Sequence, residues 1–358
     1  MHLTLFVPDL LWPDHENPQA FDFDQASALA RLLSLANRSV TPYAASDSWE
    51  SVLANVFGFT DTAPPLGALR LLGAASAFDT NDAYGRVLIC ADPVNLGFIQ
   101  QSLILSPIDA SELSAEALNA LLHSLNEEFA GEGRFFTGGS ASQWYFAPAA
   151  TGGTLPNLAA CSRLLGRRID ADESRQVLGS EGLRWLNRIQ MCLNDHPVNQ
   201  AREMQGLPVI NSIWPWGTGT LTRGNPTERP SFELAIGDNA LLRGLCAASN
   251  TAHSASAVPG GSCLLLDTHL ADAIAEDDLD AWQLAINALV QTHIVPAMAQ
   301  LQKAALSSLT LIAPDAHNIY RWTLHADHPG LRPSLLQRLL GIPRPHPDLK
   351  HLVQTWSR

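Results

Sequence analysis

The sequence predicts an α/β protein, built on a mostly parallel sheet that is flanked by helices and carries a smaller inserted α+β domain. Three observations support this fold class: apolar runs typical of buried strands, an aspartate at or just after the end of each run, and helical periodicity between them. Strands of this kind that alternate with helices are typical of a parallel sheet whose carboxyl edge carries the functional groups. The four runs are residues 3–8, 86–91, 262–266 and 309–313.

The helices follow from apolar spacing and from capping residues. Residues 26–35 have a helical pattern with Asp24 as the expected cap, and residues 111–129 have one with Ser111 as the cap. A third helix is expected over residues 183–193. Glycine-punctuated strand character follows the second helix, which indicates that this part of the chain is an insertion.

The length of 358 residues exceeds what one hydrophobic core usually organises, so we expect about two domains or one large domain with an insertion. Residues 1–110 and 171–330 are predicted to form the two parts of a core α/β domain. Residues 111–170 are predicted to form the inserted α+β domain, and residues 331–358 a C-terminal tail.

Composition excludes several classes of protein. Hydrophobic residues make up 46% of the chain and charged residues 16%, which excludes an intrinsically disordered protein. The formal net charge is −13, and the densest basic stretch holds only Arg163, Arg167 and Arg168. A duplex-binding surface needs clustered basic residues to release phosphate counterions, so we expect no nucleic-acid partner.

The cysteines and the hydropathy of the chain indicate the cellular compartment in which the protein is expected. The five cysteines form no CxxC or Cys/His zinc spacing and are expected to be reduced core residues. The N-terminal residues lack the pattern of a signal peptide, and no stretch reaches 18 apolar residues. We therefore expect no membrane partner and a cytoplasmic location.

The most specific motif lies between Asn194 and Thr220. There HPVN is followed by an arginine, a glycine, a proline, an asparagine and the run IWPWGTG. This segment resembles the archaeal-type cofactor-independent phosphoglycerate mutases of the alkaline phosphatase superfamily. Four shorter segments resemble other parts of that family in the same order: WESVLANVFGF, PLGALRLLG, GRFFTGG and VPGG.

The resemblance implies an alkaline-phosphatase-like fold with a nucleophilic serine and two divalent metals at the strand ends. Two metals supply the activated alkoxide and the positive charge that phosphoryl transfer between hydroxyls requires. Ser51 matches the nucleophile, and Asp9 matches the first metal ligand at the end of the first strand. The family's Gly-Ser-Asp is Glu50-Ser51-Val52 here, and a carboxylate beside an alkoxide opposes its formation. A structural serine and a strand-end aspartate are the alternatives for these two positions.

The other metal positions depart further from the family pattern. Asp272 and Glu276 keep the i, i+4 spacing that places two ligands on one helical face, but the family's histidine is missing there. A solvated helix start is the alternative. The family's adjacent Asp-His pair becomes Asp315 and His317, which would both serve one metal if this segment is extended. His325 stands at a later histidine position of the family.

The resemblance also implies anion-binding residues for a phosphoglycerate substrate. Arg134, Arg202 and Arg223 are the candidates, because bidentate arginines are natural receptors for phosphate and carboxylate groups. Ordinary salt bridges are the alternative for all three. His196 and Asn199 of the HPVN motif are expected to hold a helix-to-strand connection through side-chain to backbone hydrogen bonds.

Two functions of different classes follow. The first is a phosphoglycerate-mutase-like protein with a degraded two-metal site, which acts as a non-catalytic regulatory or binding protein, as in a degenerate bacterial branch of the family. It would need no cofactor, and its partner is an unknown protein or a small phosphorylated ligand. The second is a metal-dependent phosphotransferase or phosphatase with Ser51 as nucleophile and a carboxylate-rich site for manganese or magnesium rather than zinc. A structural protein without a ligand is a third interpretation.

Overall fold

The chain folds into two compact units that are each discontinuous in sequence. The computed structural model describes residues 1–12, 20, 27–43, 48–60, 63–74, 80–99, 102–108, 113–150, 156–226, 228–256, 261–332 and 348–356. The first unit comprises Met1–Ala44, Ser231–Gly237 and Ala252–Arg358, and the second comprises Ala45–Pro230 and Asp238–Thr251. The segment predicted as an insertion, residues 111–170, lies within the second unit, and its bounds stay a prediction.

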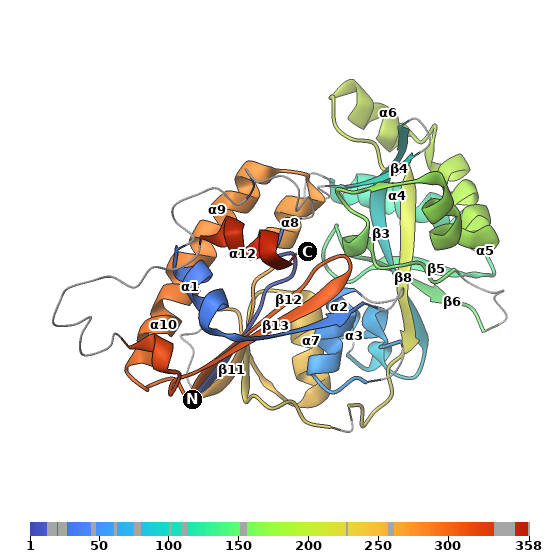
Figure 1. Ribbon diagram of the computed structural model, residues 1–358. Helices are drawn as coiled ribbons and strands as arrows, with labels where there is room; N and C mark the ends of the chain where they lie inside the picture. Colours follow the sequence, from blue (N-terminus) through green and yellow to red (C-terminus); the bar gives the residue numbers. More distant parts are fainter. Residues whose placement is uncertain are drawn as a thin grey trace. The chain divides into compact units, whose positions relative to one another are not determined.

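The first unit contains a seven-stranded sheet in the order β10-β9-β11-β1-β12-β13-β2. Figure 1 labels β11, β12 and β13 of this sheet. The first five strands in this order are parallel, and β13 and β2 add antiparallel strands at one side. This mostly parallel sheet confirms the predicted α/β class. The strands are β1 (His2–Phe6), β2 (Asn37–Pro42), β9 (Leu234–Ile236), β10 (Ala252–Ser254), β11 (Ser262–Leu266), β12 (Ser308–Pro314) and β13 (Asn318–His325).

Three of the predicted strand runs are neighbours in this sheet. β1 lies between β11 and β12, with Phe6 opposite Leu266 on one side and Ile312 on the other. Their inner residues are buried, as expected for parallel strands that are covered on both faces.

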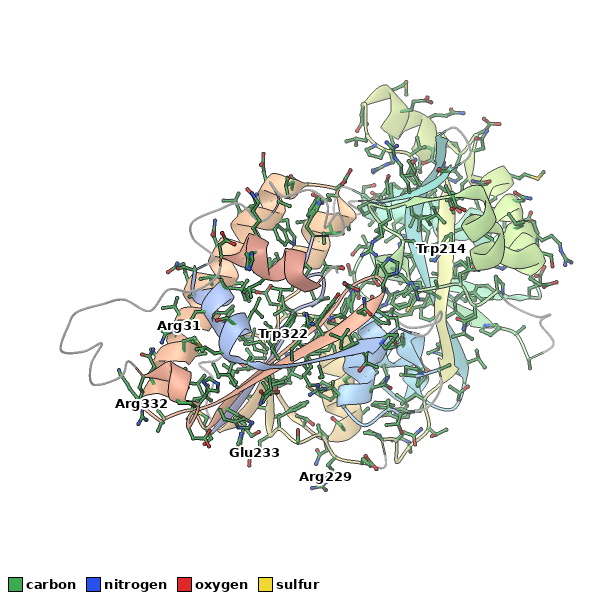
Figure 2. The ribbon with its side chains drawn as sticks, in the orientation of Figure 1. Arg31, Trp214, Arg229, Glu233, Trp322 and Arg332 are labelled. Carbon is green, nitrogen blue, oxygen red and sulfur yellow. The ribbon has the colours of Figure 1, made fainter. Side chains whose placement is uncertain are left out.

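Helices cover the sheet of the first unit, and their apolar faces form its core. Buried side chains of α1, α9 and α10 join those of β1, β12 and β13, including Trp282 and Trp322. Figure 2 shows Trp322 within this unit. The helices are α1 (Ser27–Leu35), α8 (His269–Ala275), α9 (Leu279–Leu289), α10 (Val295–Gln302) and α12 (Leu349–Trp356). A π-helical turn, Val290–Ile294, joins α9 to α10, and Pro329–Leu331 form a 3-10 turn. The cap expected at Asp24 lies outside the described residues.

The stretch from Leu279 to Gln302 is long and apolar enough, by length and composition, to cross a membrane. Its mean hydropathy is 1.2. This differs from the expectation from the sequence that no stretch reaches 18 apolar residues. Trp282, Ile286 and Leu289 on this stretch pack into the core of the first unit. The core helices of many globular domains have the same composition.

The second unit contains an antiparallel sheet in the order β5-β6-β3-β4-β7, with β8 also paired to β3. Its strands are β3 (Val87–Ile99), β4 (Ser102–Pro107), β5 (Gly133–Thr137), β6 (Trp144–Pro148), β7 (Arg168–Ile169) and β8 (Ser212–Thr220). Its helices are α2 (Trp49–Val56), α3 (Leu66–Leu72), α4 (Ala115–Glu128), α5 (Ala171–Leu193), α6 (Pro197–Met204) and α7 (Ala240–Ser249). Residues Thr80–Ala83 and Cys161–Arg163 form 3-10 turns.

The run 86–91 was predicted to join the parallel sheet, and this prediction is wrong. It begins the long strand β3, whose neighbours β4, β6 and β8 are all antiparallel to it. Asp92 therefore lies inside a strand instead of at a sheet edge. A short apolar run has no feature that separates a buried parallel strand from an antiparallel strand that is buried on both faces.

Two helix boundaries also differ from the predictions. The Ser114 side chain, not that of Ser111, caps α4 and accepts a hydrogen bond of 3.2 Å from the Ala117 backbone N–H. Ser111 lies outside the described residues. The helix expected over residues 183–193 is the last part of α5, which bends at Gly179, where φ is 58°. A side chain is strained at that backbone angle, so glycine suits the bend.

A buried ion pair links three strands of the second unit to helix α3. The Arg70 guanidinium donates bidentate hydrogen bonds of 2.9 and 2.7 Å to Asp92 on β3, and a bond of 3.0 Å to the Trp144 carbonyl on β6. The Trp216 indole on β8 donates to the same carboxylate at 2.7 Å. The guanidinium also lies 4.9 Å from the centre of the Tyr145 ring. The Asp92 carboxylate, of which 16% of the side chain is exposed, thus accepts hydrogen bonds from both Arg70 and Trp216.

Removing the negative charge of this pair is expected to destabilise the protein strongly. Asp92→Asn keeps the side-chain shape but leaves the buried Arg70 charge without its ion-pair partner. We expect the free energy of unfolding in urea to fall by about 3–5 kcal/mol. Glu181→Gln in the exposed Arg184–Glu181 pair is the matched control, for which we expect a change below about 1 kcal/mol. Equal stability of Asp92→Asn and the wild type would show that the ion pair does not hold the second unit together.

Candidate functional site

The candidate site of the first unit is the carboxyl edge of its sheet, where three neighbouring parallel strands each lead to an aspartate. The backbone N–H of Asp267 donates to the Phe6 carbonyl at 3.0 Å, and that of Asp9 donates to the Pro314 carbonyl at 2.8 Å. Asp315 follows directly. The strand register therefore brings Asp267, Asp9 and Asp315 to the same edge.

Asp9 is buried and its backbone is tightly held. The residue is only 5% exposed, and its φ is 55°. Apart from glycine, aspartate is among the few residues that adopt this left-handed backbone conformation. The Asp9 carbonyl accepts a hydrogen bond of 3.1 Å from the Trp282 indole on α9. The central strand thus ends in a sharp reversal that places a carboxyl group at the sheet edge.

Asp315 and His317 lie in the turn between β12 and β13, where an extended segment was considered from the sequence. One carboxylate oxygen of Asp315 accepts hydrogen bonds from the backbone N–H groups of His317 and Asn318, both at 2.7 Å. This is the hydrogen bonding by which aspartate stabilises a turn. His317 is exposed, and its carbonyl accepts from the Tyr43 N–H at 2.8 Å. In an extended segment the side chains of Asp315 and His317 would point the same way. The segment forms a turn instead, so this prediction does not apply to it.

His325 lies at the opposite edge of the sheet. It pairs with Ser308, the first residue of β12, whereas Asp315 follows the last residue of that strand. Seven strand residues separate the two ends, which is about 20 Å at the usual rise of a β-strand. The structure therefore does not bring His325 together with Asp9 or Asp315.

Asp272 lies on α8, after β11, and Glu276 caps the C-terminus of that helix. The Thr268 hydroxyl donates to the Asp272 carboxylate at 3.5 Å. Asp272 keeps an exposed surface, but desolvation by the surrounding residues is the main cause that raises the pKa of its carboxyl, and the nearby charge of Glu276 acts in the same direction. Glu276 is exposed. These two residues fit a helix end better than a pair of metal ligands.

Three further titratable residues gather near the end of β11. Asp267 accepts hydrogen bonds from the His269 backbone N–H at 3.1 Å and from its imidazole Nδ1 at 2.7 Å. This side-chain bond raises the pKa of His269. His293, on the π-helical turn, is half-buried, and burial lowers its pKa while the charge of Asp267 opposes that shift. His293 was not predicted from the sequence, because a π-helical turn has no clear sequence pattern.

The carboxyl edge does not fit the two-metal centre that the sequence resemblance implies. Within the ranges that the structure describes, no group of three or more His, Cys, Asp or Glu side chains is placed to hold a metal ion. A centre of two metals needs about six to seven ligands. The donors at this edge are instead spread over a strand end, a turn and a helix, and several are already bonded to neighbouring groups.

Ser51 belongs to the second unit, where its hydroxyl is part of a capping box at the start of α2. The Ser51 hydroxyl accepts from the Ser48 N–H at 2.9 Å and donates to the Ser48 carbonyl at 2.8 Å. The Ser51 N–H donates to the Ser48 hydroxyl at 3.3 Å. Ser51 is only 6% exposed. Its hydroxyl proton and a lone pair are therefore used to hold the helix end.

Glu50, beside Ser51, is a buried carboxyl group. It is 5% exposed, and the Ser162 hydroxyl donates to it at 2.8 Å. Burial raises the pKa of Glu50 to about 7, against the opposing effects of Ser48, Ser162 and the Arg70 charge. Near neutral pH this carboxyl is close to half protonated, because desolvation disfavours the charged form.

The three candidate anion-binding arginines lie in different surroundings of the second unit. Arg134 is exposed on β5. Arg202 is buried on α6 and donates from Nε to the Pro208 carbonyl at 2.8 Å. Arg223 donates to the Asn81 side chain, and its guanidinium lies 4.7 Å from the centre of the Tyr84 ring. The nine residues of β8, a strand of about 26 Å, lie between Arg202 and Arg223 in the chain, so these two are not expected to line one site.

The HPVN motif holds a helix-to-strand connection, which confirms its structural interpretation. The His196 imidazole caps α6 by accepting from the Val198 N–H at 3.2 Å. The Asn199 side chain donates to the carbonyls of Leu193 and Ile210, each at 2.8 Å, and accepts from the Ile210 N–H at 2.9 Å. Burial lowers the pKa of His196, which suits a neutral imidazole that accepts a backbone hydrogen bond.

Removing the Ser51 hydroxyl is expected to weaken the start of α2. Ser51→Ala deletes one half of the capping box, so we expect the free energy of unfolding to fall by about 1 kcal/mol in urea titrations. Ser142→Ala, which removes an exposed hydroxyl, is the control and is expected to change stability by less than about 0.5 kcal/mol. A Ser51→Ala protein with unchanged stability would speak against the capping role.

The buried Glu50 is expected to make stability depend on pH. Its folded pKa lies above the unfolded value, so its contribution is fully present below about pH 4.5 and is lost as pH rises to about 7. Glu50→Gln cannot ionise. We expect the variant to gain about 2 kcal/mol relative to wild type between pH 5 and pH 8, measured by urea unfolding. Parallel pH profiles of the two proteins would contradict the raised pKa.

No family model and no curated protein matches the sequence. Among solved structures, the chain is similar to the PH0037 protein from Pyrococcus horikoshii, with 12% identity, a TM-score of 0.47, and coverage of 90% of this chain and 87% of that one. It is also similar to the cofactor-independent phosphoglycerate mutase from Thermoplasma acidophilum, with 14% identity, a TM-score of 0.37, and coverage of 90% and 89%. At these identities and TM-scores, the similarity assigns neither a reaction nor a ligand to this chain.

Proposed function

We propose that this chain acts by binding a partner or ligand, as a regulatory or interaction protein, on a scaffold that has lost a two-metal phosphoryl-transfer centre. The observation that supports this most strongly is the use of the Ser51 hydroxyl in a capping box. A nucleophilic serine needs a base or a metal to take its proton. Here the Ser51 hydroxyl donates its proton in a hydrogen bond to the Ser48 carbonyl. The acidic residue that precedes Ser51 in the chain, Glu50, is buried.

The carboxyl edge supports the same proposal from the metal side. Asp315 uses a carboxylate oxygen to close a turn, and Asp267 is bonded to His269. A residue that must release such bonds before it can bind a metal loses affinity for that metal. The proposal includes the finer resemblance to the bacterial regulatory protein RpfE, a cytoplasmic location, and no need for a cofactor. Its partner would be a protein or a small phosphorylated ligand, with no nucleic acid and no membrane involved.

A second candidate is a metal-dependent phosphotransferase or phosphatase with altered ligands. The convergence of Asp9, Asp267 and Asp315 at the ends of three neighbouring strands favours it. Oxygen donors of this kind suit manganese or magnesium. Under this alternative, Ser51 would have to leave its capping box to react.

Titration calorimetry with manganese and with zinc on the full chain separates the two candidates. We expect no tight binding of two ions per chain, and the same weak signal from Asp9→Asn as from the wild type. Phosphoglycerate turnover is expected to be absent. Tight binding of two manganese ions that is lost in Asp9→Asn, or turnover of a phosphoester that is lost in Ser51→Ala with the fold intact, would establish the second candidate instead.

A further inference from the structure

A cavity in the first unit lies between α1 and α10, away from the aspartates of the carboxyl edge. Its volume is about 370 Å³. Ligand sites of small molecules have volumes of about 300–1,000 Å³, so this cavity is large enough for one. Its walls come from Ser27, Ala28 and Arg31 on α1, and from Val295, Met298, Ala299 and Gln302 on α10.

Arg31 is the one charged side chain among the described residues of this lining. Its Nη2 donates to the Leu331 carbonyl at 3.0 Å, while its buried Nε has no hydrogen-bond partner. No carboxylate among the residues described here forms an ion pair with it, although the whole chain has a formal net charge of −13. A guanidinium is always charged and matches the geometry of an anionic group. The cavity therefore offers a positive charge that none of the seven described lining residues balances.

Arg332 adds positive charge next to the same site without lining it. Its Nε donates to the carbonyl of Gln302, the last residue of α10, at 3.3 Å. Arg31 and Arg332 lie on the same side of the first unit in Figure 2. Two neighbouring cations raise the local potential and attract an anion.

The rest of the wall is mainly apolar. Ala28, Val295, Met298 and Ala299 contribute hydrocarbon surface, and the flexible methionine can adapt to the shape of an alkyl chain. At about 30 Å³ for each water-sized group, the cavity accommodates about twelve such groups. Inorganic phosphate would use only a small part of this space and would leave the apolar wall against water.

From this combination we propose that the cavity binds a small organic acid with an unbranched apolar chain of medium length. Its carboxylate lies against the Arg31 guanidinium, and its chain lies along Ala28, Met298 and Ala299. The inference does not depend on the proposed loss of phosphoryl transfer, since none of the residues considered for that reaction lines this cavity. It adds a ligand class to a protein that we propose to act by binding.

Titration calorimetry of the full chain with sodium octanoate tests the proposal. We expect saturable binding of one octanoate per chain. Octan-1-ol has the same chain without the charge and is expected to bind at least about ten-fold more weakly, and inorganic phosphate at least about ten-fold more weakly still. These two probes separate recognition of the acid from simple apolar binding and from simple anion binding.

Three variants locate the site. Arg31→Gln is expected to weaken octanoate binding by about ten-fold or more. Because Arg31 also holds the Leu331 carbonyl, Ala299→Leu fills the cavity from the apolar wall without touching that bond, and it is expected to weaken binding by a similar factor. Arg332→Gln removes a neighbouring charge that does not line the cavity, and we expect less than about a three-fold change.

The outcomes are unambiguous when the thermal unfolding of each variant confirms its fold. Loss of octanoate binding in Ala299→Leu, with binding kept in Arg332→Gln, supports the site. The proposal is overturned by a lack of saturable octanoate binding to the wild type, by equal affinity for octan-1-ol or phosphate, or by unchanged affinity in Ala299→Leu. Absence of metal binding in the separate titration with manganese has no bearing on these results.

Discussion

The parallel pairing of β1 with β11 on one side and β12 on the other determines the geometry of the first unit. Both pairings run along the whole of β1, from His2 to Phe6. Because the three strands point the same way, their carboxyl ends meet at one edge, and the residues that follow them are neighbours in space. The positions of Asp9, Asp267 and Asp315 all depend on this register. A shift by one residue would exchange the side chains that face the two sides of the sheet and would disrupt the packing on both.

Local hydrogen bonding then decides what these polar groups can do. A serine or aspartate near a chain reversal has backbone N–H groups within reach, and bonding to them stabilises the fold. Ser51 does this at the start of α2, and Asp315 does it between β12 and β13. The same oxygen atoms cannot bind a metal or attack a phosphate without giving up those bonds. The side chains at these two positions thus stabilise the backbone around them.

Buried charge is handled in three different ways in this protein. Asp92 is paired with Arg70 and accepts a further hydrogen bond from Trp216, so both ions are compensated. Glu50 accepts a hydrogen bond from the neutral Ser162 hydroxyl, and burial keeps the carboxyl partly neutral. Arg31 cannot neutralise itself, because guanidinium keeps its proton at all accessible pH values. Among the residues that the structure describes, no carboxylate pairs with Arg31, so an external anion beside the cavity would gain a favourable interaction with its charge.

The amino-acid sequence alone determined the α/β class, the apolar runs that form β1, β11 and β12, and the structural role of His196 and Asn199, because apolar runs and short-range hydrogen bonds act over a few residues. It did not determine the partners of β3, since strand pairing depends on residues far apart in the chain. Nor did it reveal the turn at Asp315, the π-helical position of His293 or the cavity beside Arg31. Those features arise where separate elements pack together, and only the tertiary structure sets which side chains then share a surface.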